Sequence, residues 1–122
     1  MPEKKLNVAI FGISGYAGRK LLEILLLHQS VKVNLGFVAP DEPDLPVEQM
    51  HPRVAKTIHL NCYNKVDWRY LEDNCDIVFL ALPHVVSMSF VPQLLSLGKK
   101  VIDLSADYRF SDPEIYGKWY QQ

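Results

Sequence analysis

Phe11-Gly12-Ile13-Ser14-Gly15-Tyr16-Ala17-Gly18 is the stretch of this 122-residue chain that decides its fold. An apolar run, Leu6 to Phe11, leads into it and predicts a buried strand. From Gly15 to His28 leucines recur at helical spacing, and Val31 to Val38 is rich in β-branched residues. Strand, glycine-rich bend, helix and strand together predict a βαβ unit with a right-handed crossover.

The three glycines of the bend, Gly12, Gly15 and Gly18, have the spacing G-x-x-G-x-x-G rather than the commoner G-x-G-x-x-G. A pyrophosphate at such a bend needs a tight turn, a backbone without Cβ atoms beside the phosphates, and close packing of helix on strand. Amides at the helix N-terminus face the anion, and the Ser14 hydroxyl is a further candidate donor. Any tight strand-to-helix turn can hold glycines, but the place of this one between two strands predicts a dinucleotide site.

The rest of the chain repeats the alternation of strand and helix. Asp76 to Leu82 is almost entirely apolar, which predicts a strand buried on both faces of a parallel sheet. A helix is expected over Ser87–Leu97, closed by Gly98 and kinked in its early turns by Pro92. Another strand is expected over Lys100–Leu104.

Shorter elements lie between and after these. We expect a short strand over Thr57–Leu60, and short helices over Asp67–Leu71 and Asp112–Tyr120 that each begin at an aspartate cap. Residues 39–56 contain four prolines, which predicts a long irregular loop. The fold expected for residues 1–122 is therefore a single α/β domain with a Rossmann-like, doubly wound, mainly parallel sheet.

Composition excludes several classes of function. The chain has 13 basic and 14 acidic residues without a block of either sign, which argues against nucleic-acid binding. Leu21 to Leu27 is the longest strongly apolar stretch, contains Glu23, and is far too short to cross a membrane. We expect no targeting segment at the N-terminus, and we expect the two cysteines to be reduced thiols. We expect a cytoplasmic protein without a metal site.

Two later segments carry a resemblance to a known family. They are Ala81-Leu82-Pro83-His84 and Val101-Ile102-Asp103-Leu104-Ser105-Ala106-Asp107-Tyr108-Arg109. Together with the glycine bend they resemble N-acetyl-γ-glutamyl-phosphate reductase in order and spacing, from about residue 6 to residue 120. The resemblance implies an enzyme that uses NADPH to reduce N-acetylglutamyl phosphate, an acyl phosphate, to a semialdehyde in arginine biosynthesis.

The same resemblance implies roles for individual residues. The cofactor phosphates would be held by Gly12, Ser14, Gly15, Tyr16, Ala17 and Gly18. Leu82, Pro83 and His84 would lie along the cofactor, with Ser105 and Ala106 on its nicotinamide side. For His84 the alternative is a residue at a helix start, bonded only to local backbone.

The family's chemistry starts from a cysteine thiolate that displaces phosphate to form a thioester, which hydride then reduces. Neither Cys62 nor Cys75 stands in the family's Asn-Pro-Gly-Cys-Tyr-Pro-like segment. We therefore expect no catalytic residue here, a truncated domain whose catalytic and substrate-binding part is absent, and no turnover by this chain alone. Such a domain exposes apolar surface, so we also expect a homo-oligomer.

The residues leave two choices open. A carboxylate at the end of the second strand favours NAD, whereas an arginine favours the 2′-phosphate of NADP. This end reads Phe37-Val38-Ala39-Pro40-Asp41-Glu42, without arginine and with its acids slightly late, although the resemblance implies NADP. The chain also barely differs in these motifs from the aminoadipyl-phosphate reductase of lysine biosynthesis, and a stand-alone nucleotide-binding regulatory module is a further alternative. The Leu-Pro-His and Ser-Ala-Asp segments disfavour aspartate-semialdehyde dehydrogenase.

Overall fold

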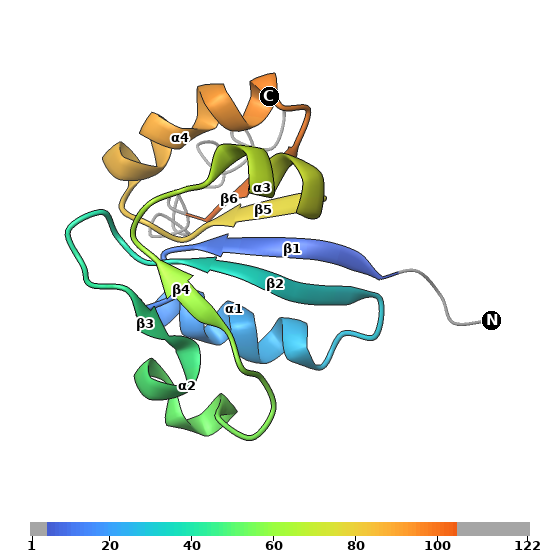
Figure 1. The fold of residues 1–122 in the computed structure, drawn as a ribbon, viewed down its shortest axis with the longest axis vertical. Helices are drawn as coiled ribbons and strands as arrows, with labels where there is room; N and C mark the ends of the chain where they lie inside the picture. Colours follow the sequence, from blue (N-terminus) through green and yellow to red (C-terminus); the bar gives the residue numbers. More distant parts are fainter. Residues whose placement is uncertain (1–4, 105–122) are drawn as a thin grey trace, which may run out of the picture.

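A computed structural model describes residues 5–104 of the chain and places six strands in one sheet (Figure 1). The strands are β1 (Leu6–Phe11), β2 (Val31–Phe37), β3 (Leu45–Pro46), β4 (Asn61–Tyr63), β5 (Ile77–Leu80) and β6 (Lys100–Asp103). Their order across the sheet is β3-β4-β2-β1-β5-β6. Every neighbouring pair is parallel except β3 and β4. The expected α/β, Rossmann-like, mainly parallel sheet is confirmed.

Helices cover both faces of the sheet. They are α1 (Tyr16–Leu26), α2 (Val47–Met50), the 3₁₀ turn η1 (Pro52–Val54), α3 (Trp68–Asn74) and α4 (His84–Ser96). In Figure 1, α1 and α2 lie on one side of the sheet, and α3 and α4 lie on the other. The sheet is therefore the middle layer of three.

Alternation along β1 explains why both faces are buried. Val8 and Ile10 pack with Leu22 of α1 in one core cluster, whereas Ala9 and Phe11 pack in a second cluster against the other helices. Successive side chains of a strand point to opposite faces, so this central strand contributes to both layers. The same holds for β5, whose expected burial on both faces is confirmed.

The topology places a switch point of the chain at the carboxyl end of β1. From β1 the chain crosses to β2 on one side, while β5 pairs with β1 on the other side and leads on to β6. Ligands of open α/β sheets bind at such a switch point, outside the carboxyl ends of the strands. Gly12 follows β1 at this place.

Residues 39–56 are not the irregular loop that was expected. They contain β3, α2 and η1, so that prediction was wrong. The prolines are tolerated because Pro46 is the N-cap of α2 and Pro52 is the first residue of η1, where no helical amide donor is needed. Residues 39–56 are therefore ordered, and they form an excursion of the chain between β2 and β4.

The short strand expected at Thr57–Leu60 was also wrong, since the strand is β4 at Asn61–Tyr63. Pairing with β2 fixes its place, because Gly36 lies opposite Cys62 and Phe37 opposite Tyr63. The helix expected to start at Ser87 starts earlier, at His84, directly after Pro83 as N-cap. Local sequence preferences therefore predicted elements of the right kind, whereas tertiary contacts determine where these elements begin and end.

Two expected helix boundaries are confirmed. Asp67 caps α3 by accepting a hydrogen bond from the Tyr70 amide at 3.1 Å. Gly98, with φ of +74°, ends α4, and its amide donates to the Leu95 carbonyl at 3.0 Å. α4 continues through Pro92 as one helix.

The helix expected at 112–120 lies outside the described residues. Within residues 5–104, no helix is long and apolar enough to span a bilayer.

Candidate nucleotide site

The glycine bend is tied to the ends of both neighbouring strands. The amides of Gly12 and Ile13 both donate to the carbonyl of Phe37, at 2.8 and 3.1 Å. On the other side, the Ala81 amide donates to the carbonyl of Phe11 at 2.7 Å. The carboxyl ends of β1, β2 and β5 are thereby fixed around one point.

Gly12 and Gly18 are required by the packing of the bend itself. Gly12 has φ of +88°, and a Cβ there would lie 2.5 Å from the carbonyl oxygen of Ala81. A Cβ on Gly18 would collide with the Gly12 carbonyl and lie 2.8 Å from the Ile13 Cα. Both glycines allow the close approach of helix and strand that the sequence predicted.

Gly15 is different, because nothing in the described part of the chain requires it to lack a side chain. Its φ of −81° suits any residue. Among residues 5–104, a Cβ there would find only the Gly12 carbonyl oxygen within 4 Å, at 3.6 Å. Gly15 is exposed and is the N-cap of α1. The bend is therefore open where the helix begins, and a Cβ would project into that opening.

The N-terminus of α1 presents unpaired donors to this opening. No side chain caps the helix. Within residues 5–104, the first intrahelical bond runs from the Arg19 amide to the Gly15 carbonyl, so the amides of Tyr16, Ala17 and Gly18 have no acceptor. Such amides, aligned with the positive end of the helix dipole, form an anion site.

Tyr16 stands exposed at the start of α1, with 72% of its surface accessible. The Arg19 guanidinium carbon lies 5.3 Å from the centre of its ring, and the Lys20 ammonium lies 5.8 Å from it. These two cations add positive charge to the first turns of the helix.

The second predicted segment, Leu82-Pro83-His84, begins beside the glycine bend. Leu82 is buried, and its carbonyl accepts a hydrogen bond from the buried Ser87 hydroxyl at 3.1 Å. Pro83 and His84 follow as the exposed start of α4. A Cβ on Gly12 would lie 3.0 Å from the Leu82 nitrogen, which shows how closely the two segments approach. Ser105 and Ala106 lie outside the described residues.

Ser14 does not point its hydroxyl into an empty site. The hydroxyl donates to Glu42 Oε1 at 2.8 Å. The same carboxylate oxygen accepts the Ala39 amide at 3.0 Å. Sequence reasoning noted the two acids after β2 but did not place either of them on the glycine bend. The signal was their position just past the strand end.

His51 is a second contact that sequence reasoning missed. Its side chain is buried, and its Nε2 lies 2.7 Å from the carbonyl oxygen of Ile13. Because a carbonyl only accepts, Nε2 carries the proton and donates. The excursion between β2 and β4 therefore holds the bend at two neighbouring residues, Ile13 and Ser14.

Neither cysteine has the surroundings of a nucleophile. Both are free and buried. Burial, with a smaller contribution from the nearby Glu48 charge, raises the pKa of Cys62 to about 12. Burial, partly opposed by the Lys99 charge, raises the pKa of Cys75 to about 11. Both therefore remain thiols at neutral pH, whereas catalysis by sulfur requires the thiolate.

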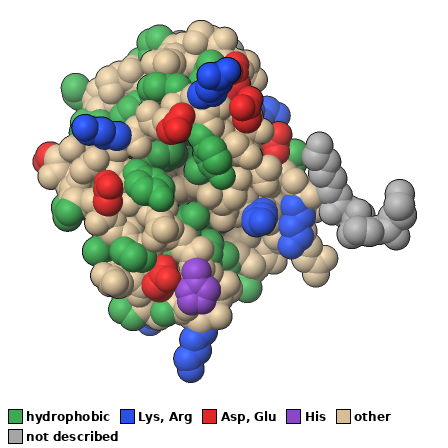
Figure 2. All heavy atoms as spheres, in the orientation of Figure 1, with side chains coloured by type: hydrophobic (Ala, Val, Ile, Leu, Met, Phe, Trp, Pro, Cys, Tyr) green, Lys and Arg blue, Asp and Glu red, His purple; other side chains and the backbone are tan. Residues whose placement is uncertain are grey.

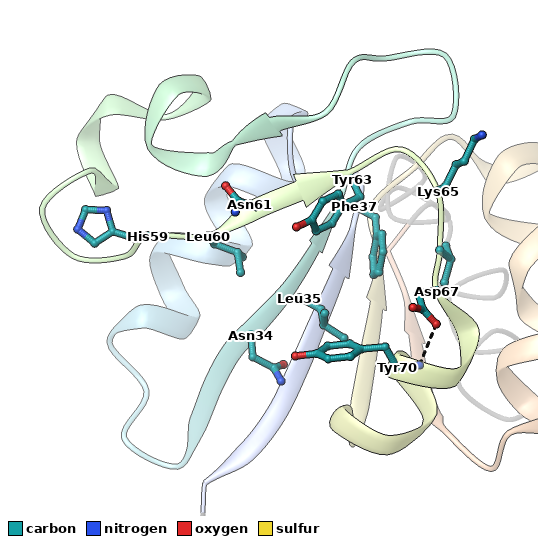
Figure 3. Close-up of a pocket in the computed structure, with 11 residues that line it drawn as sticks. Asn34, Leu35, Phe37, His59, Leu60, Asn61, Tyr63, Lys65, Asp67 and Tyr70 are labelled. Carbon is teal, nitrogen blue, oxygen red and sulfur yellow. Dashed lines mark hydrogen bonds between the residues drawn. The ribbon is translucent and has the colours of Figure 1, made fainter.

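A hollow of about 660 Å³ lies between β2, β4 and the start of α3 (Figure 3). Phe37, Tyr63 and Tyr70 line it with Lys65 and Asp67 at its rim, and no residue of the glycine bend contributes. The face that Figure 2 shows has exposed hydrophobic side chains among acidic and basic ones, without a block of one charge. The residues that line the hollow are therefore not those of the glycine bend.

Comparison with known proteins identifies the class to which this fold belongs. The family model described as "Semialdehyde dehydrogenase, NAD binding domain" matches residues 7–119. The chain belongs to this family of NAD-binding domains.

Curated relatives carry two names. An N-acetyl-gamma-glutamyl-phosphate reductase of Methanobrevibacter smithii is 45% identical over 93% of this chain. A [LysW]-L-2-aminoadipate/[LysW]-L-glutamate phosphate reductase of Saccharolobus solfataricus is 42% identical over 95% of it. The chain spans 32% of the length of each. The resemblance inferred from the motifs is confirmed, and both reductases inferred from them are found.

Solved structures confirm the fold. An aspartate semialdehyde dehydrogenase with NADP from Candida albicans matches with a TM-score of 0.65 and 15% identity, over 87% of this chain and 31% of that one. GenD2 from gentamicin A biosynthesis, in complex with NAD, matches with a TM-score of 0.64 and 19% identity, over 84% and 27%.

Proposed function

We propose that this chain supplies the nicotinamide-nucleotide site of an acyl-phosphate reductase. The observation that carries the proposal is Gly15, a glycine that neither backbone conformation nor packing requires. A ligand that approaches the backbone closely at this position would explain why residue 15 has no side chain. The neighbouring amides of Tyr16 and Ala17, which have no acceptor among the described residues, are the donors that a pyrophosphate needs.

The residues present fit such a cofactor. Gly12, Gly15 and Gly18 would form the cradle, with Ser14, Tyr16 and Ala17 around the phosphates. Leu82, Pro83 and His84 would lie along the cofactor toward the nicotinamide, and we place Ser105 and Ala106 beside that ring from the family resemblance. When bound, the cofactor supplies hydride. The resemblance implies NADPH, while the ribose end of the site is argued separately below.

The substrate is proposed from the relatives. We propose N-acetylglutamyl phosphate, reduced to the semialdehyde in arginine biosynthesis, with the carrier-bound aminoadipyl phosphate of lysine biosynthesis as second candidate. Relatives with both names match this chain at similar identity. Catalytic and substrate-binding residues would then belong to a further domain. A cytoplasmic homo-oligomer is part of the same proposal.

We further propose that this chain alone does not turn over substrate. Its only cysteines, Cys62 and Cys75, are buried thiols with raised pKa values. Thioester formation needs an exposed thiolate, which neither provides. The chain therefore binds and orients the cofactor, and the acyl transfer requires a nucleophile from elsewhere.

Two measurements on the full 122-residue chain test this function. Titration with NADH and NADPH, followed by nucleotide fluorescence, should show saturable binding of at least one of them. The same chain, mixed with N-acetylglutamyl phosphate and either NADH or NADPH, should not oxidise the nucleotide. Lack of saturable binding would refute the cofactor site. Oxidation that requires the acyl phosphate would refute the binding-only role.

A further inference from the structure

We propose that Glu42 makes this site select a nicotinamide nucleotide whose adenosine ribose has a free 2′-hydroxyl, NAD(H), over one with a 2′-phosphate. The inference rests on the proposed function, because it concerns which nucleotide the same site accepts. It departs from the NADP that the family resemblance implies.

Glu42 is held at the carboxyl end of β2 by a small network. Its amide donates to the Ala39 carbonyl at 2.9 Å, which closes a tight turn directly after the strand. Its own carbonyl accepts the Asn64 side-chain amide at 2.7 Å. The turn is therefore anchored to the chain after β4, and the Glu42 side chain, half-buried, is held in one place.

The Glu42 side chain is held against the glycine bend. Glu42 Oε1 accepts the Ser14 hydroxyl at 2.8 Å and the Ala39 amide at 3.0 Å. Both bonds use Oε1, and within residues 5–104 no hydrogen bond reaches Oε2. The carboxylate thus stands between the phosphate loop and the end of the second strand. It keeps one oxygen for a further donor.

This is where the adenosine ribose of a dinucleotide lies in folds of this type, when its pyrophosphate sits on the bend. A ribose 2′-hydroxyl donates to a carboxylate, so Glu42 can bind it. A 2′-phosphate carries up to two negative charges and would be repelled by a carboxylate at contact distance. Asp41 adds a second acid to the turn, and the sequence has no lysine or arginine between Phe37 and Arg53.

The charge of Glu42, rather than its shape, carries the selection. Glu42→Gln keeps the length of the side chain and an amide oxygen that accepts from Ser14 and Ala39. It removes the negative charge and replaces the second carboxylate oxygen by an amide NH₂ group, which cannot accept from a ribose hydroxyl. Asp73→Asn removes the same charge from an exposed residue near the end of α3, away from the bend, and serves as the matched control.

The experiment titrates the full chain and both variants with NADH and with NADPH at one fixed ionic strength. We expect the wild type and Asp73→Asn to bind NADH at least about tenfold more tightly than NADPH. Glu42→Gln should tighten NADPH binding and bring the two dissociation constants within about threefold. Thermal unfolding of each variant shows whether the turn is intact.

The outcomes separate the two proposals. If neither nucleotide binds the wild type, the proposed function fails and this inference fails with it. If the wild type binds NADPH as tightly as NADH, only the selection by Glu42 is refuted. A Glu42→Gln variant with an unchanged preference for NADH would also refute it, and would leave Glu42 a purely structural anchor of the turn.

Discussion

The Nε2 atom of His51 lies 2.7 Å from the carbonyl oxygen of Ile13, although the two residues are 38 positions apart in the sequence. The bond is buried, and it joins the excursion after β2 to the glycine bend. The next residue of the bend, Ser14, is held by the same excursion through Glu42. The glycine bend is therefore supported from outside the βαβ unit that contains it.

Replacement of His51 should destabilise the fold through this bond. His51→Ala leaves the Ile13 carbonyl buried without a donor and opens a cavity, so we expect the free energy of unfolding to fall by about 2–3 kcal/mol. Urea denaturation measures the change. His59→Ala, at an exposed histidine paired with Glu48, is the control and should cost less than about 1 kcal/mol. Equal losses in the two variants would show that the His51 bond contributes little.

Gly36 should tolerate a side chain poorly because of its neighbours across the sheet. A Cβ there would lie 2.8 Å from Cys62 Sγ and 3.0 Å from Ile13 Cδ1. We expect Gly36→Ala to lower the free energy of unfolding by about 1–3 kcal/mol. The loss should shrink in a Cys62→Ala background, where the sulfur is gone. A double-mutant cycle by urea denaturation tests this, and strict additivity would contradict the contact.

The buried thiols should make stability fall at alkaline pH. Both pKa values are raised from about 9, to about 12 for Cys62 and about 11 for Cys75. The unfolded chain therefore loses thiol protons above pH 9 while the folded chain keeps them, and the folded state is progressively disfavoured. Each thiol should contribute a decline of about 1.4 kcal/mol per pH unit until pH reaches its folded pKa.

Denaturant unfolding between pH 8 and pH 10.5 measures this slope. Cys62→Ala should make it shallower by the share of one thiol, and Cys62→Ala with Cys75→Ala should remove the share of both. Lysine and tyrosine titration is common to all three proteins and cancels in the comparison. An identical slope in the double variant would show that the thiols do not titrate as their burial requires.

The sequence predicted the parts of the fold that local pattern controls. The runs at β1, β2, β5 and β6 are apolar or β-branched enough to be recognised as strands, and Gly98 and Asp67 mark helix ends through their own backbone preferences. Prolines misled the prediction for residues 39–56, because Pro46 and Pro52 stand at helix starts rather than inside helices. Composition alone does not distinguish these two situations.

The site was only partly predictable, for a physical reason. Gly12, Gly15 and Gly18 lie close together in the sequence. The approach of Leu82 to the bend follows from the parallel pairing of β1 with β5. His51 and Glu42 contact the bend only because the excursion after β2 folds back over it. Such contacts depend on the path of a loop, which no periodicity encodes. That packing requires a glycine at positions 12 and 18 but not at position 15 also became visible only from the neighbouring atoms in the structure.

The nucleotide site is tested most directly by comparing Gly15→Ala with the wild type in a titration with NADH and NADPH. We expect at least a tenfold weaker affinity for the nucleotide that binds, with a loss of about 1 kcal/mol or less in stability, because the added Cβ blocks the ligand and not the fold. Gly98→Ala, at a positive φ far from the bend, should do the reverse and lower stability while leaving affinity unchanged. A Gly15→Ala chain that binds nucleotide as tightly as the wild type would contradict a nucleotide site at the glycine bend.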